Sequence, residues 1–248
     1  MDRRMFLGAG VTTLAALAPL AAAPADLPKS WDGLVLVKSK KLEAVYLAPG
    51  ADFAPYTKVR LGPTSVAFQK DWRENYNEQA SFDLQLSEAQ AEQIMTSVRK
   101  GFESIFAKAF TKAGYAVVDT PGKDVLQLNS AVINLAITQP NVQAPEMSAN
   151  FSNTAGQATM ILEARDSLTG ALLGRALDAE VAGDFWEMRN SVTNYAAFTQ
   201  VGEKWAQASV QGLEKLRSNA SLAPPAPKAA AAAGAAKPAA AKAGPPPP

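Results

Sequence analysis

Five carboxylates gather along one stretch of the sequence, and a pair of carboxylates is what acid–base chemistry on a glycan requires. In glycoside hydrolysis one carboxylic acid protonates the leaving oxygen, while the other acts as base or nucleophile. Strand periodicity places Glu163 and Arg165 on one face, however, and this favours a solvated ladder of charges over a catalytic pair. The five carboxylates are Glu163, Asp166, Asp178, Glu180 and Asp184.

The chain has 248 residues and contains no His and no Cys. It therefore lacks Ser-His-Asp and Cys-His nucleophiles and the usual metal ligands other than carboxylates. We expect a protein that is not an enzyme and that binds no cofactor and no metal. A lipid anchor on an exported protein also needs a Cys at the cleavage site, so we expect none here.

The first 25 residues have the composition of an export signal. A basic start precedes an apolar run over residues 8–20, and small residues precede a cleavage site near Ala25. The Arg-Arg-x-Phe-Leu pattern resembles a twin-arginine signal, and an ordinary signal that starts with two arginines is the alternative. Either route predicts a periplasmic protein with no permanent membrane anchor after cleavage. The signal-motif residues are Arg3, Arg4, Phe6 and Leu7.

The charge balance argues against a nucleic-acid partner. The chain has 24 basic and 23 acidic residues. Removing the signal and the tail takes away two arginines and three lysines but only one aspartate, which leaves a mild acidic excess. Nucleic-acid surfaces are strongly basic, so an envelope protein or a cell-wall component is the expected partner. The oligomeric state is left open.

Composition divides the chain into four parts. After the signal over residues 1–25, residues 26–40 are rich in Lys and are expected to form a linker. Residues 41–219 have the length and the apolar content of a single domain. Residues 220–248 are almost wholly Ala, Pro, Lys and Gly, and such a segment cannot bury enough apolar area to stay ordered. We therefore expect a disordered tail.

The apolar pattern of the domain predicts strands, a helix, more strands with a hairpin, and a second helix. Ser87 and Gln90 form a capping box, and Gly114 ends the helix that follows. A second helix is expected over residues 193–217. In the strands, residues 131, 133, 135 and 137 are expected on one face, and residues 158, 160, 162 and 164 on another. The fold class is α+β, with an antiparallel or mixed β-sheet and two amphipathic helices packed on one face.

Aromatic residues outside the long elements are candidates for a partner surface. The alternative for each is packing beneath a loop or a turn, as when Trp72 anchors a turn to the core. Residues 139–156 form a long polar stretch, and loops of this length are often functional. The possible partner surface consists of Trp72, Tyr76, Phe151, Phe185 and Trp186.

Several segments carry a family resemblance. They are the Glu-Ala-Val-Tyr-Leu-Ala-Pro-Gly-Ala-Asp-Phe run at residues 43–53, Tyr-Thr-Lys-Val at 56–59, Gly-Pro-Thr-Ser-Val-Ala-Phe at 62–68, Asp71-Trp72, and the Asp-Ser-x-Thr-Gly turn at 166–170. Together they resemble the bacterial envelope family catalogued as domain of unknown function 3313, over roughly residues 40 to 217. The resemblance implies an envelope location and an α+β fold, and it implies no activity. Many members are lipid-anchored, and this chain departs from them by having no Cys.

The leading hypothesis is a non-enzymatic accessory or binding module of the bacterial cell envelope. One alternative is a carboxylate-dependent cell-wall glycan hydrolase, which needs two close carboxylates in a cleft. Another is a soluble carrier of a small apolar ligand, which needs a sizeable cavity between the helices and the sheet.

Overall fold

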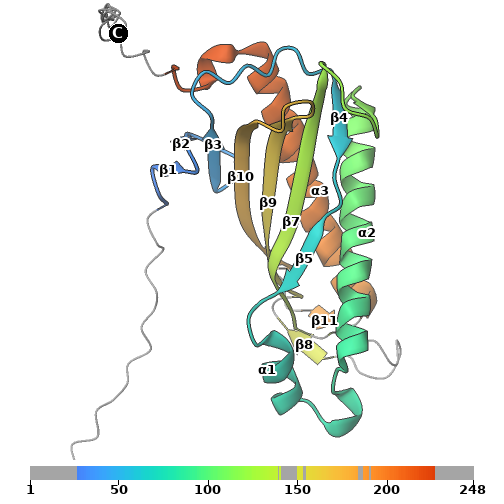
Figure 1. Ribbon diagram of the computed structural model, residues 1–248. Coiled ribbons are helices and arrows are strands. Elements are labelled where there is room, and N and C mark those ends of the chain that lie inside the picture. Colours follow the sequence, from blue (N-terminus) through green and yellow to red (C-terminus); the bar gives the residue numbers. More distant parts are fainter. Residues whose placement is uncertain are drawn as a thin grey trace, which may run out of the picture.

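A computed structural model describes residues 27–138, 140, 150–152, 155–183, 187–189 and 191–226. Within these residues the chain forms a nine-stranded mixed sheet, a separate two-stranded sheet and three α-helices (Figure 1). The α+β class with a mixed sheet is therefore confirmed. The large sheet contains β1 (Ser30–Trp31), β2 (Leu34–Val37), β3 (Ala44–Leu47), β4 (Lys58–Leu61), β5 (Ser65–Phe68), β6 (Ala116–Val117), β7 (Val125–Ile137), β9 (Gly156–Asp166) and β10 (Leu172–Ala182).

The strands of the large sheet follow the order β1-β2-β3-β10-β9-β7-β4-β6, and β5 also pairs with β7. The pairs from β1 to β7 are antiparallel, whereas β4 and β5 run parallel to β7. A parallel pair needs a long crossover, and the segment containing α2 supplies it between β5 and β7. Gly62 and Pro63 separate β4 from β5, and Pro63 has no backbone N–H that could donate to a neighbouring strand.

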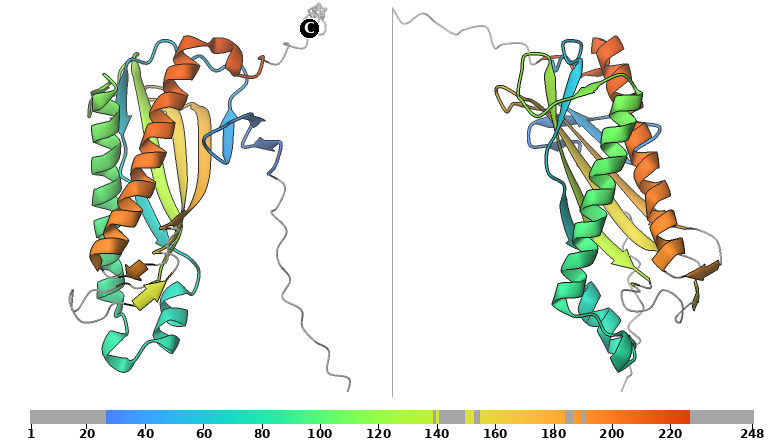
Figure 2. Two further views of the ribbon diagram at one scale, coloured as in Figure 1. Left: turned by 180° about the vertical axis from the view of Figure 1, so that it is seen from behind. Right: turned by 90° about the vertical axis from the view of Figure 1, so that its right-hand side faces the viewer.

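The two long helices are α2 (Glu88–Lys112) and α3 (Ser191–Ser218). The predicted capping box is present, because Ser87 Oγ accepts from Gln90 N and Gln90 Oε1 accepts from Ser87 N. The predicted glycine follows the helix at Gly114, with φ of +88°. The two helices contact each other and lie side by side along the sheet (Figure 2). Phe102, Phe106 and Phe110 of α2 share one core with the sheet and α3.

One end of the molecule carries smaller elements (Figure 1). They are α1 (Trp72–Gln79), the short helix η1 (Phe82–Leu84), and the small sheet of β8 (Asn150–Ser152) and β11 (Glu187–Arg189). A last turn, η2 (Ala220–Leu222), follows α3 at the other end. Among the described residues, no helix combines the length and the apolar character that crossing a bilayer requires.

The inward face of β9 is as expected, but that of β7 changes along the strand. Ala158, Met160 and Leu162 are buried in the core. In β7 the buried residues are Val125, Leu126, Leu128, Val132 and Leu135, so the expectation that residues 131, 133, 135 and 137 share one face is wrong. Asn134 has φ of +51°, and the pairing with β9 shifts between Ile133 and Ala136. This bulge inserts one residue and changes which face the following side chains occupy.

Residues 26–40, expected to be a linker, instead contain β1 and β2 of the large sheet. Leu34 is only 2% exposed, and it packs with Ala44 and Tyr46. The apolar run of β2 pairs with β3, and burial of this run stabilises the strand although lysines flank it on both sides. The export signal, with Arg3, Arg4, Phe6 and Leu7, lies outside the described residues. Of the expected tail, residues 220–226 are described, and Pro224 O accepts a hydrogen bond of 2.7 Å from Gly50 N.

Gly156 offers a test of this sheet geometry. Its φ is +145°, and a Cβ at this position would lie 2.0 Å from the carbonyl oxygen of Ala136. We expect Gly156→Ala to lower the free energy of unfolding by about 2 kcal/mol or more, because both the strain and the clash oppose the native backbone. Gly212→Ala is the matched control, since a Cβ there meets nothing within 4 Å. It should stabilise α3 by about 0.5–1 kcal/mol. Urea unfolding of both variants measures the difference, and equal stabilities would contradict the geometry.

Candidate functional site

An apolar cavity of about 340 Å³ lies between α2 and α3 and reaches down to the sheet. From α2, the residues Ile94, Val98, Phe102 and Ile105 line it. Their spacing of three and four residues places them on one side of the helix. We call this space the apolar cavity.

The floor and the second wall come from the sheet and from α3. Val132, Leu135 and Ala158 form the floor and are almost fully buried. Phe198 and Trp205 line the α3 side, and the Trp205 ring lies 6.4 Å from the Phe102 ring. Elements far apart in the sequence therefore line the same pocket.

Two glycines shape the space between the helices. A Cβ on Gly202 would lie 3.0 Å from Cδ1 of Ile105, so this glycine lets the two helices approach closely. A Cβ on Gly101 would meet nothing within 4 Å, and Gly101 lines the apolar cavity. A larger side chain at position 101 would therefore enter free volume.

Trp205 is fixed by a buried carboxylate. Trp205 Nε1 donates to Asp178 Oδ2 at 2.9 Å, and the backbone N of Glu43 donates to Asp178 Oδ1 at 2.7 Å. Burial raises the pKa of Asp178, the hydrogen bonds from Glu43 and Trp205 oppose this rise, and the neighbouring Glu180 carboxyl adds to it. Glu180 itself forms an ion pair with Lys204 of α3. This group of contacts holds α3 against β10.

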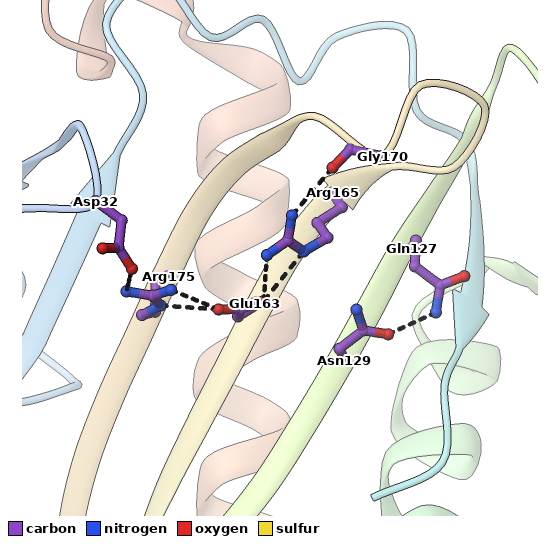
Figure 3. A network of polar contacts seen from close by, with 7 residues as sticks. All are labelled: Asp32, Gln127, Asn129, Glu163, Arg165, Gly170 and Arg175. Atoms are coloured by element: carbon purple, nitrogen blue, oxygen red, sulfur yellow. Dashed lines mark hydrogen bonds and ion pairs between the residues drawn. The ribbon is translucent and has the colours of Figure 1, made fainter.

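The other hairpin carboxylates are also engaged by the protein's own donors. Arg175 and Arg165 both bind Glu163, with closest distances of 2.6 Å and 2.9 Å, and Arg175 also binds Asp32 at 2.8 Å (Figure 3). Asp166 accepts from Thr169 within the turn and from the Tyr56 hydroxyl at 2.8 Å. The expected ladder of charges is present at Glu163 and Arg165.

These contacts leave no carboxylate pair placed across a cleft among the described hairpin residues. Glu163 lies on the sheet face turned away from α3 (Figure 3). Asp178 instead contacts Trp205 of α3, and both of its carboxylate oxygens accept hydrogen bonds. Asp184 lies outside the described residues. No cluster of His, Cys, Asp or Glu suited to a metal ion occurs in the part of the chain that the structure describes.

Of the predicted partner-surface residues, Trp72, Tyr76 and Phe151 lie at the end that carries α1 and the small sheet. Trp72 is buried, stacks on Phe68 at 4.2 Å and donates to the carbonyl oxygen of Ile137. Tyr76 continues the stack at 6.1 Å from Trp72. Phe151 belongs to β8, and Phe185 and Trp186 lie outside the described residues. The structure thus gives Trp72 an anchoring role, and the partner surface remains a prediction.

The cavity-lining residues were recognised in the sequence only as apolar helix faces. Val98, Phe102, Phe198 and Trp205 have the spacing of ordinary core positions, and a periodic pattern does not reveal where packing stops short. Gly101 and Gly202 were the available signal, because glycine in the interior of a helix is unfavourable without a packing reason.

The fold and the cavity define an α+β protein with an apolar site between its two long helices. The chain belongs to the family described as "Protein of unknown function (DUF3313)", whose family model matches residues 24–209. No curated protein matches the sequence.

Solved structures show only distant likeness. PelC from Paraburkholderia phytofirmans, described as a dodecamer, is 16% identical, with 66% of this chain and 94% of that chain covered and a TM-score of 0.33. The protein XCC0632 from Xanthomonas campestris is 11% identical, with 75% and 97% covered and a TM-score of 0.38. A putative neuraminyllactose-binding hemagglutinin homolog from Helicobacter pylori is 12% identical, with 69% and 89% covered and a TM-score of 0.30. Likeness at this level says nothing about the ligand or the assembly of this chain.

The buried carboxylate makes a prediction about pH. Because the pKa of Asp178 is raised on folding, the folded protein holds this proton more tightly than the unfolded chain does. Asp178 therefore favours folding below its unfolded pKa, and this contribution is lost as pH rises through the raised value. We expect the stability of Asp178→Asn relative to wild type to improve as pH rises from about 4 to 7. Denaturant unfolding at several pH values measures this trend.

Glu163→Gln is the matched control, with the opposite sign. Burial works against ionisation of Glu163, but hydrogen bonds from Arg175 and Arg165 outweigh it and lower the pKa of this carboxyl. Its contribution is present above the unfolded pKa and is lost as pH falls through the lowered value. The loss in the free energy of unfolding of Glu163→Gln, relative to wild type, should therefore be smallest at acidic pH. If stability relative to wild type changed with pH in the same way for both variants, the opposite pKa shifts of Asp178 and Glu163 would be refuted.

Proposed function

We propose that this protein is a non-enzymatic binding module of the bacterial cell envelope that holds a small apolar ligand between α2 and α3. The observation that carries the proposal is the apolar cavity of about 340 Å³. Small-molecule sites are typically clefts of about 300–1,000 Å³ with mostly apolar walls and a few placed polar groups. The polar groups of this lining include Gln93, Ser97 and Thr199.

Burial of apolar surface supplies the driving force for such a ligand. Each Å² of apolar surface removed from water contributes about 25 cal/mol. Phe102 and Trp205 offer aromatic surface that is already held in place, since Trp205 is bound to Asp178. A preformed wall reduces the ordering cost of binding.

The envelope location rests on other support. The first 25 residues have the composition of an export signal, and the family resemblance points to the envelope. In this proposal the mature chain works in the periplasm, where an apolar compound needs a protein to shield it from water.

The ligand proposal can be tested with the apolar dye N-phenyl-1-naphthylamine, whose fluorescence rises in apolar surroundings. We expect wild type to bind the dye and Gly101→Leu to weaken this binding at least about tenfold, because the new side chain occupies the apolar cavity. Leu also favours a helix more than Gly does, so the variant should remain folded. Fluorescence titration gives the dissociation constants.

Gly212→Leu is the matched control. It makes the same change on α3, outside the lining of the apolar cavity, at a position where a Cβ meets nothing within 4 Å. It should bind the dye as wild type does. Absence of binding to wild type, or equal binding by both variants, would remove the proposal.

A second candidate function is capture of an envelope protein by the end that carries α1. Phe82 is 92% exposed and Tyr195 is 68% exposed, and large exposed apolar side chains often mark interaction sites. This end also carries Tyr76 and β8, where the partner surface was predicted.

Site-specific photocrosslinking in cells tests this candidate. A benzoylphenylalanine at position 82 should capture a reproducible partner. The same group at position 168 should not, because Leu168 lies in the β9–β10 turn at the other end of the molecule. Leu168 is a fair control, since it is apolar and 55% exposed. Equal patterns from both positions, or capture from position 168 alone, would count against a partner surface at the α1 end.

A further inference from the structure

A second hollow lies on the face of the sheet turned away from α3, and polar side chains form much of its lining. Its volume is about 450 Å³. It lies beside the Gly62–Pro63 turn and the β9–β10 turn, and it shares no lining residue with the apolar cavity. We call it the polar hollow.

Strand register assembles the side chains of the polar hollow. Arg60 of β4 is paired with Gln127 of β7, and Gln127 is paired with Arg165 of β9. Paired residues on neighbouring strands point to the same face, so these three side chains form a row across the sheet. Asn129 lies two residues further along the same face, and it accepts a hydrogen bond of 2.9 Å from Gln127.

The row is held in place by the surrounding structure. Arg165 donates to Glu163 at 2.9 and 3.1 Å and to the carbonyl oxygen of Gly170 at 3.0 Å (Figure 3). A Cβ on Gly62 would lie 2.5 Å from Oδ1 of Asn129, so only glycine allows the chain to pass so close to this amide. Contacts within the protein therefore hold Arg165, Gln127 and Asn129 in place.

The polar hollow offers both hydrogen-bond donors and hydrogen-bond acceptors that form no hydrogen bond or ion pair with another described residue. Arg60 and Asp119 form no ion pair with another described residue, and the amide nitrogen of Asn129 donates to none of them. Arg60 and Asn129 thus offer donors, and Asp119 offers acceptors. A hydroxyl group both donates and accepts, whereas a simple anion only accepts.

The charges of the lining also balance. Two arginines and two aspartates line the same space, namely Arg60, Arg165, Asp119 and Asp166. An ion of either sign would meet a like charge as well as an opposite one, so charge alone selects no ion. We propose that the polar hollow binds a neutral saccharide, through hydroxyl groups that pair with Arg60, Asp119 and Asn129.

The test uses the purified full chain with N-acetylglucosamine and glucose as neutral probes and inorganic phosphate as an anion. Amide signals of Gly62 and Gly170 are followed by nuclear magnetic resonance. We expect the neutral saccharides to shift these signals and Arg60→Gln to weaken binding about tenfold, through loss of a hydrogen bond from a charged donor. Asp119→Asn should also weaken binding. Neither side chain has an ion-pair partner among the described residues, so we expect both variants to remain folded.

Arg73→Gln is the matched control, because Arg73 lies on α1 at the other end of the molecule and, among the described residues, forms an ion pair with its neighbour Glu74 alone. It should bind saccharide as wild type does. Three results would overturn the proposal: no shift with either saccharide, a shift with phosphate alone, or equal weakening by Arg60→Gln and Arg73→Gln. None of these results bears on dye binding in the apolar cavity, so the two proposals stand or fall separately.

Discussion

Both backbone edges of β7 need hydrogen-bond partners, and the rest of the fold is arranged around this requirement. β9 pairs with one edge from Leu126 to Ile137, and β4 and then β5 pair with the other. The strand on the second edge is interrupted at Pro63, so two short strands, β4 and β5, together pair with this edge of β7. The helices can cover the sheet only because its central strands are satisfied in this way, since unpaired backbone groups beneath a helix would be costly.

The sheet separates two chemically different spaces. Beneath the helices, Val132 and Leu135 of β7 form part of an apolar floor, while Gln127 and Asn129 of the same strand line a polar wall on the opposite face. Alternation along the strand places Gln127 and Asn129 on the face opposite to Val132. The bulge at Asn134 matters here, because it returns Leu135 to the helix side after the alternation has been broken.

Part of this structure could be predicted from local patterns in the sequence. The capping box at Ser87, the glycine at position 114 and the alternation of β9 depend on neighbours in the chain, and each was predicted. The edge strand β2 depends on pairing with β3, and the inward face of β7 depends on a bulge whose cause lies in the pairing with β9. Such features are not encoded within one segment. The apolar cavity was foreseen only as a requirement of one hypothesis, because unfilled volume depends on how closely two helices approach.

The N-terminal strands are attached to the sheet in a way that has a mechanical consequence. Trp31 lies over the guanidinium of Arg175 at 4.1 Å, and Asp32 binds the same group. β1 and β2 are the outermost strands at one edge, so tension applied from residue 27 would peel them away one strand at a time. The first resistance would come from the Arg175 contacts, and β7 and β9 would bear load only after β3 had been released. The protein would therefore yield gradually from its N-terminal edge, with the helix-covered half of the sheet remaining intact longest.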